Sequence, residues 1–145
     1  MTTQTTPQPT TPTPAEALAS KLAGYIGTAN YYYLPHWGKA SLHYTDGIRA
    51  LCTEAEAFWL LDQLNATLYD NTQFAAGFWL VRITSHDYKG KIEIAYDSTD
   101  AGTLINTDGE RGKADHTTTL DFTDFPEGTF EFFIVNKIAM LKSEY

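Results

Sequence analysis

The chain has 145 residues, ten of them basic and eighteen acidic, which gives a formal net charge of −8. This acidity opposes direct binding to nucleic acid, because affinity for a phosphate backbone depends on lysine and arginine displacing counterions. No stretch approaches the roughly 20 apolar residues of a membrane-spanning helix, and the N-terminus lacks the positive start and apolar run of a signal peptide. We therefore expect a cytoplasmic protein without a membrane partner.

The first 14 residues differ in composition from the rest of the chain. They contain only Met, Thr, Gln and Pro, with no charge. Such a segment buries too little apolar surface to offset the entropy of ordering it, so residues 1–14 are predicted to be a disordered tail. Residues 15–145 suit a single domain, long enough to bury about two thirds of its unfolded surface.

Helical patterns occupy the first half of this domain. Good helix formers follow Pro14, and Gly24 is placed to end them, which predicts a short N-terminal helix. Thr45 or Asp46 can cap a main helix running from about 46 to 68, within which the Thr-Glu-Ala-Glu segment at 53–56 either restarts or continues it. Asn65 falls mainly outside its apolar stripe. The predicted inward residues are Ala57, Leu60, Leu61, Leu64 and Leu68.

Strand patterns occupy the second half. Residues 74–84 carry apolar side chains on both faces of an extended segment, which predicts a central strand. Residues 92–96 alternate between apolar and polar side chains and are predicted to form a hairpin with this strand through a turn at 87–90. Residues 97–115 form either a long mobile loop or a short edge strand. Further strands are predicted at 117–122, 130–135 and 138–142. The fold class is therefore α+β, with an antiparallel sheet of about five strands packed on one main helix.

The single cysteine excludes two kinds of site. With Cys52 alone, neither an intramolecular disulfide nor a multi-thiolate zinc site is possible. Cys52 lies in an apolar helical pattern, so we expect a small core residue.

Five short motifs occur in order along the chain. They are residues 44–47 (Tyr-Thr-Asp-Gly), 57–62 (Ala-Phe-Trp-Leu-Leu-Asp), 78–81 (Phe-Trp-Leu-Val), 122–126 (Phe-Thr-Asp-Phe-Pro) and 141–145 (Leu-Lys-Ser-Glu-Tyr). Together they resemble a bacterial family, domain of unknown function 6876, over roughly residues 23–145. The resemblance implies that the first motif begins a helix and the fourth forms a turn. It brings no reaction, cofactor, ligand or catalytic residue.

Histidine is the natural candidate for acid–base or metal chemistry, because imidazole titrates near neutrality and binds transition metals. None of the four histidines lies in a recognised ligand pattern. His43 precedes Asp46 by three residues, and a His–Asp pair can orient a general base; a capping Asp46 beside an ordinary polar His43 is the simpler interpretation. We therefore expect no metal or cofactor. The four histidines are His36, His43, His86 and His116.

Aromatic residues gather between positions 31 and 44, where they could line a pocket or an interface instead of the core. The binding candidates in this segment are Tyr31, Tyr33, His36, Trp37 and Tyr44.

These observations favour a non-catalytic protein-binding or interaction module whose acidic surface engages a basic protein partner. A mobile-element accessory protein is one specific version of this hypothesis. The alternative is a small His/Asp-dependent hydrolase or metal-dependent enzyme built on His43 and Asp46. A third hypothesis is a homo-oligomer formed through an exposed edge strand.

Overall fold

The computed structural model describes residues 11–27, 30–33, 42–96 and 103–145, and within them three α-helices and two 3₁₀ turns accompany a seven-stranded mixed sheet. The helices are α1 (Pro14–Leu22), α2 (Asp46–Glu54) and α3 (Phe58–Asp70), and the 3₁₀ turns are η1 (Thr72–Ala75) and η2 (Lys142–Glu144). The strands are β1 (Tyr31–Tyr33), β2 (His43–Thr45), β3 (Phe78–His86), β4 (Lys89–Tyr96), β5 (His116–Leu120), β6 (Gly128–Val135) and β7 (Ile138–Met140).

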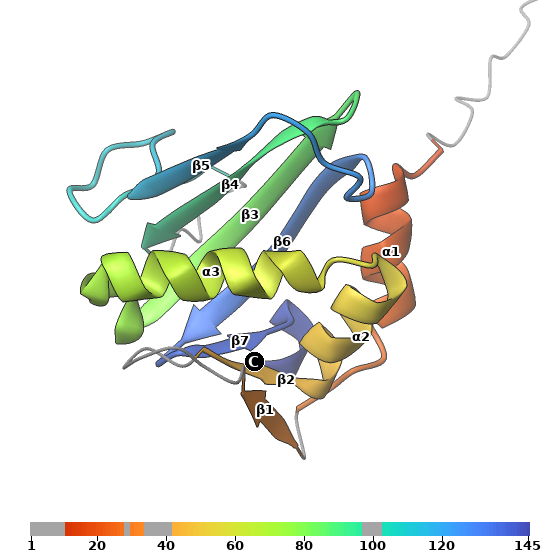
Figure 1. Cartoon of the computed structure of the whole chain (residues 1–145), viewed down its shortest axis with the longest axis horizontal. Helices are drawn as coiled ribbons and strands as arrows, with labels where there is room; N and C mark the ends of the chain where they lie inside the picture. The colour runs from red at the N-terminus through yellow and green to blue at the C-terminus, as the bar shows by residue number, and fades with distance from the viewer. Residues whose placement is uncertain (1–10, 28–29, 34–41, 97–102) are drawn as a thin grey trace, which may run out of the picture.

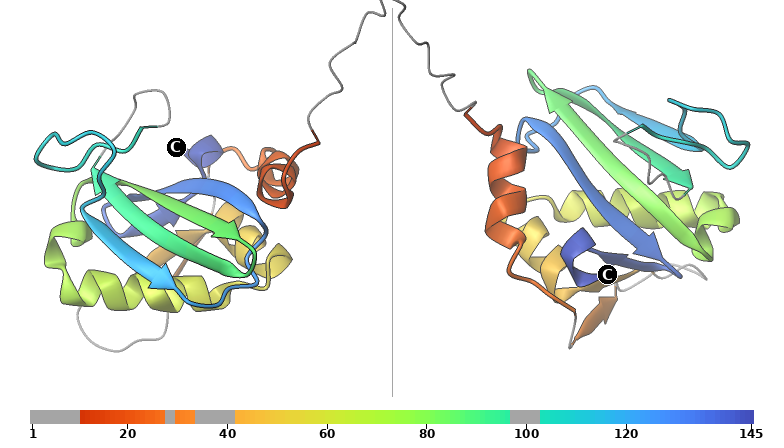
Figure 2. Two further views of the ribbon diagram at one scale, coloured as in Figure 1. Left: turned by 90° about the horizontal axis from the view of Figure 1, so that it is seen from above. Right: turned by 180° about the vertical axis from the view of Figure 1, so that it is seen from behind.

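The elements form two layers. The strands lie in the order β1-β2-β7-β6-β3-β4-β5, and α3 crosses one face of this sheet with α2 at its start (Figure 1). Seen from behind, the sheet stands in front of α3, and α1 lies beside β6 (Figure 2). The α+β class is therefore confirmed.

The predicted sheet of about five antiparallel strands is wrong in two respects. Two extra strands, β1 and β2, extend the sheet, and β2 pairs in parallel with β7, so that Tyr44 lies opposite Ala139. The residues of β1 lie in an aromatic segment for which we expect extended backbone, but the sequence does not count either strand in the sheet, because each has only three residues, too few to show an alternating pattern. The β2–β7 pairing also joins segments almost 100 residues apart, which no local signal encodes.

The predicted helix from 46 to 68 is interrupted. The break follows Glu54, and α3 begins at Phe58. Between them Glu56 adopts a positive φ of 51°, and the amide of Ala57 donates to the carbonyl of Cys52 at 2.8 Å. The left-handed residue turns the chain, so that both helices pack on the sheet.

The predicted N-terminal helix and the predicted hairpin are present. Thr13 caps α1, its hydroxyl accepting from the amide of Glu16 at 3.2 Å, so the helix begins inside the segment assigned to the tail. The β3–β4 hairpin turns at Asp87 and Tyr88, which both have positive φ, as do the two residues 136 and 137 between β6 and β7. Such backbone angles match the right-handed twist of the strands.

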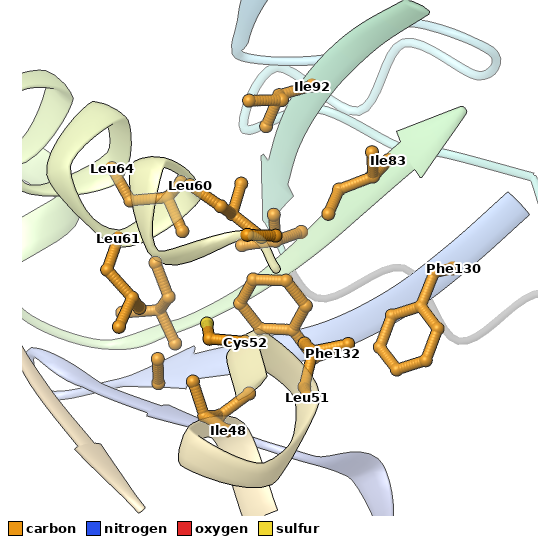
Figure 3. Packing of buried hydrophobic residues seen from close by; sticks show 14 of the residues in the cluster. Ile48, Leu51, Cys52, Leu60, Leu61, Leu64, Ile83, Ile92, Phe130 and Phe132 are labelled. Carbon is orange, nitrogen blue, oxygen red and sulfur yellow. The ribbon is translucent and has the colours of Figure 1, made fainter. Parts of the chain in front are cut away.

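The core lies between the helices and the sheet. All five predicted inward residues of the main helix are buried, but Asn65 is buried too, contrary to prediction, because its side-chain oxygen accepts from the amide of Leu42 at 2.9 Å. Figure 3 shows Cys52 among Ile48, Leu51 and Phe132, as expected for a core residue. Burial raises the pKa of the Cys52 thiol to about 12, which keeps it protonated at neutral pH.

A smaller cluster covers part of the opposite face of the sheet. Leu104 packs there with Leu80 and Ala95; it comes from the segment 97–115, which is predicted to be either a long loop or a short edge strand. This loop contains an isolated antiparallel bridge between Ile105 and Arg111. Residues 97–102 lie outside the described part of the chain.

Replacing Trp79 tests the assignment of the inner face. The ring is 6% exposed, contacts Phe74 edge-on at 4.7 Å between centroids, and donates to the carbonyl of Ala76 at 2.8 Å. Trp79→Ala should cost about 3–5 kcal/mol of unfolding free energy, measured by denaturant titration. Trp59, half-buried on α3, should cost less when changed to alanine, and equal losses would contradict the assignment.

Candidate functional site

The start of α2 is held by a carboxylate from the C-terminal end of the chain. Glu144 is 8% exposed. Its Oε1 accepts from the hydroxyl of Thr45 at 2.6 Å and from the amide of Leu141 at 2.9 Å, and its Oε2 accepts from the amide of Gly47 at 3.1 Å. Thr45 in turn accepts from the amide of Ile48 at 3.3 Å and is the helix cap. Two free amides of the helix start are thereby satisfied.

Gly47 is required by the same contact. A Cβ at this position would collide with the Glu144 carboxylate, and would lie 2.7 Å from Cδ1 of Leu141. Gly47 is therefore needed for close approach and not for an unusual backbone angle, since it is a regular helical residue. Thr45, Gly47 and Glu144, which belong to the first and last sequence motifs, serve stability.

A double-mutant cycle tests this contact. Glu144→Ala leaves a buried hydroxyl and two amides without their acceptor, and should cost about 1–3 kcal/mol or more of unfolding free energy. Gly47→Ala alone should cost about 1–3 kcal/mol through overpacking. Because the second substitution clashes mainly with the side chain that the first removes, the double variant should be less destabilised than the sum. Additive losses would contradict the contact.

Asp46 faces away from this buried contact. Its Oδ1 accepts from the hydroxyl of Tyr32 at 2.8 Å and its Oδ2 from the side-chain amide Nδ2 of Asn30 at 3.3 Å. The Arg49 guanidinium lies over the Tyr32 ring, 4.7 Å from its centroid, and hydrogen bonding to Tyr32 raises the pKa of Arg49. Asp46 therefore orders the β1 segment against α2, and Thr45 is the cap.

These residues border an open groove of about 650 Å³. Three of its charged side chains are already engaged: Asp46 and Arg49 as described, and Glu54 by Lys21 at 2.7 Å. The groove is lined by Gly24, Tyr25, Ile26, Gly27, Tyr32, Asp46, Arg49, Ala50, Thr53 and Glu54.

Some of the predicted binding residues lie beside this groove. Tyr31 is exposed on β1, and Tyr44 is half-buried on β2, where its ring stacks on Tyr32 with 5.5 Å between centroids. Burial raises the pKa of Tyr44. Tyr33 lies on β1, but only its backbone is described. His36 and Trp37 lie outside the described residues.

The three described histidines lie on three different strands. His43 is on β2, near one edge of the sheet. His86 ends β3 and pairs with Glu127 at 2.8 Å, and His116 begins β5, its ring beside Phe74. Within the described part of the chain, no three histidine, cysteine or carboxylate side chains converge closely enough to hold a metal ion. The predicted His43–Asp46 pair stays a prediction.

A second candidate surface lies at the turn between β3 and β4. The rings of Tyr88 and Phe122 stack almost parallel, 5.9 Å between centroids at an interplanar angle of 2°, although the residues are 65% and 72% exposed. The amide of Thr123 donates to the carbonyl of Tyr88 at 2.8 Å and fixes the two segments together. We call Tyr88 and Phe122, with the neighbouring Asp87, Asp121 and Asp124, the aromatic tip.

A hollow of about 390 Å³ adjoins the aromatic tip. Carboxylates of Asp87, Asp124 and Glu127 line it together with Tyr88. Glu127 is engaged by His86 and by the amide of Asp87. Among the described residues, no side-chain hydrogen bond or ion pair engages Asp87 or Asp124. The hollow is therefore lined by the Tyr88 ring and by two carboxylates, Asp87 and Asp124, that no described side chain neutralises.

The sequence did not single out the aromatic tip. It assigned Tyr88 to a turn and Phe122 to a strand, and neither assignment indicates exposure. Within the fourth motif the side chains divide: Thr123 and Phe125 are buried, whereas Phe122 and Asp124 are exposed. The sequence carries no signal for this division, because the apolar Phe122 is exposed while the polar Thr123 is buried.

An ion network lies on the face of the sheet opposite α3. Glu131 on β6 pairs with Arg82 at 2.8 Å and with Lys142 at 2.7 Å. Burial alone raises the pKa of Glu131, but the hydrogen bonds from Lys142 and Arg82 and their charges outweigh it and hold the pKa below its ordinary 4.5.

This network predicts a pH dependence of stability. Because the folded-state pKa of Glu131 lies below the unfolded value, its contribution is fully present above that value and is lost as pH falls through the folded pKa. In Glu131→Gln the unfolding free energy should therefore fall less steeply as the pH drops below about 4.5. Urea titration at several pH values measures this slope. Asp62→Asn, exposed on α3, is the control, and equal profiles for both variants would contradict the assignment.

A family model described as "Family of unknown function (DUF6876)" matches residues 16–145. The chain belongs to this family. The match covers nearly the whole described domain, including both the Glu144 contact and the aromatic tip. No curated protein and no solved structure matches the chain. None of the helices in the described ranges has the length and apolarity that spanning a bilayer requires.

Proposed function

We propose that this member of the family is a non-catalytic protein-binding module, which takes a basic cytoplasmic partner at the aromatic tip. The observation that carries the proposal is the Tyr88–Phe122 pair, two large stacked rings left mostly exposed. Exposed aromatic residues are costly to leave in water and are enriched among the residues that dominate binding energy at protein interfaces.

The charge around the pair supports a basic partner. Asp87, Asp121 and Asp124 are all exposed beside it. A lysine or arginine side chain entering the adjacent hollow would meet the Tyr88 ring and two carboxylates, thereby combining a cation–π contact with ion pairing. The chain's net charge of −8 also accelerates association with a basic protein at low salt.

The groove beside Asp46 supports binding less well, because its three charged side chains, Asp46, Arg49 and Glu54, are already engaged by other residues of the chain. The enzyme alternative, built on His43 and Asp46, stays an untested prediction. It has less support than binding at the aromatic tip, because the Asp46 carboxylate already accepts hydrogen bonds from Tyr32 and Asn30.

Capture of a partner from bacterial lysate, quantified by mass spectrometry, tests the proposal. Phe122→Ala should reduce the captured partner at least tenfold, since hot-spot aromatics contribute about 2 kcal/mol or more. Asp124→Asn should reduce it and weaken its salt dependence. Both positions are exposed, so thermal melting should remain near that of wild type.

Matched controls come from α3. Phe58 is 44% exposed and Asp62 is exposed on the same helix. Phe58→Ala and Asp62→Asn should leave capture unchanged. If Phe122→Ala captured as much partner as Phe58→Ala, the aromatic tip would not be the binding surface.

A further inference from the structure

The strand next to the aromatic tip is an open edge of the sheet. β5 is the last strand in the order and pairs with β4 alone among the described strands. Alternate residues of such a strand direct their amides and carbonyls away from the sheet, where another chain can bind them.

This edge lacks the usual protection. Residues 116–120 read His-Thr-Thr-Thr-Leu, without lysine, arginine, carboxylate, proline or glycine. Thr117 and Thr119 are exposed, and β-branched residues favour the extended backbone that an added strand needs. The opposite edge differs, since β1 has only three residues, and short edges offer few hydrogen bonds.

Acidic residues stand at both ends of β5. Asp115 precedes it, half-buried, with its two carboxylate oxygens accepting from the backbone amides of Tyr96 and Thr107 at 2.9 Å, and the exposed Asp121 follows it. If a second copy paired in antiparallel fashion about Thr118, each Asp115 would face an Asp121 of the other copy. Like charges placed opposite one another destabilise a strand pair. Basic residues at these positions would instead be attracted.

The edge is continuous with the aromatic tip. Leu120, the last residue of β5, pairs with Gly90, two residues beyond Tyr88. Phe122 follows Leu120 by two residues, and the Thr123 amide binds the Tyr88 carbonyl. A segment laid along β5 would therefore deliver one of its ends to the aromatic tip.

We infer that the partner docks by strand addition: an extended segment of a basic protein pairs with β5, and its flanking lysine or arginine residues reach the exposed Asp121 and the rest of the aromatic tip. This inference rests on the proposed function and adds the mode of recognition. Main-chain hydrogen bonds to the edge supply affinity, and the flanking charges supply selection against a second copy.

The test uses two synthetic peptides and the full chain. The first has a Thr-Val-Thr-Val-Thr centre with Arg-Lys at each end. The second has the same sequence with alternate backbone amides N-methylated, which preserves the charges and side chains but removes the strand hydrogen bonds. Affinities are measured by fluorescence anisotropy, and protection of the β5 amides is measured by hydrogen exchange.

The inference predicts that the methylated peptide binds at least tenfold more weakly and that only the unmethylated one slows exchange in β5. Equal affinity of the two peptides, or no binding of either at millimolar concentration, would overturn strand addition. A concentration-dependent dimer seen by light scattering, with β5 amides already protected, would overturn it in favour of a second copy. The proposed function is judged separately, by whether Phe122→Ala abolishes lysate capture.

Discussion

The buried carboxylate of Glu144 joins segments that are almost 100 residues apart. It satisfies the amide of Gly47 at the start of α2, the hydroxyl of the helix cap Thr45, and the amide of Leu141. Thr45 also ends β2, whose preceding residues pair with β7. One side chain therefore connects the start of α2, the strands β2 and β7, and the C-terminal turn. Because these polar groups are buried, leaving them without hydrogen-bond partners would cost stability.

This constraint separates the structural from the exposed parts of the family's motifs. Thr45 and Gly47 are needed to receive Glu144, whereas Asp46 faces outward and holds Tyr32. In the fourth motif Thr123 and Phe125 are buried, and Phe122 and Asp124 remain exposed. Stability accounts for the buried members alone. The exposed aromatic pair, beside an open and uncharged strand edge, is what remains for recognition of a partner.

The parts of the fold that could be predicted from the sequence were those encoded by local patterns. The α1 helix, the β3–β4 hairpin and the buried stripe of α3 follow from period and turn chemistry. The break at Glu56, the parallel pairing of β2 with β7 and the burial of Asn65 depend on contacts made only after folding. The aromatic tip was missed for the same reason, because composition does not tell which aromatic side chains a fold leaves outside.

Native-state hydrogen exchange of wild type and Glu144→Ala tests the central role of this carboxylate most directly. The account predicts that the amides of Gly47, Leu141 and the β2–β7 pair lose protection together in the variant. The β3–β4 hairpin should keep its relative protection, because the hydrogen bonds of the Glu144 side chain go to Thr45, Gly47 and Leu141. Ser143→Ala, exposed beside it, should change none of them. Unchanged protection at Gly47 and across β2 and β7 in Glu144→Ala would contradict the account.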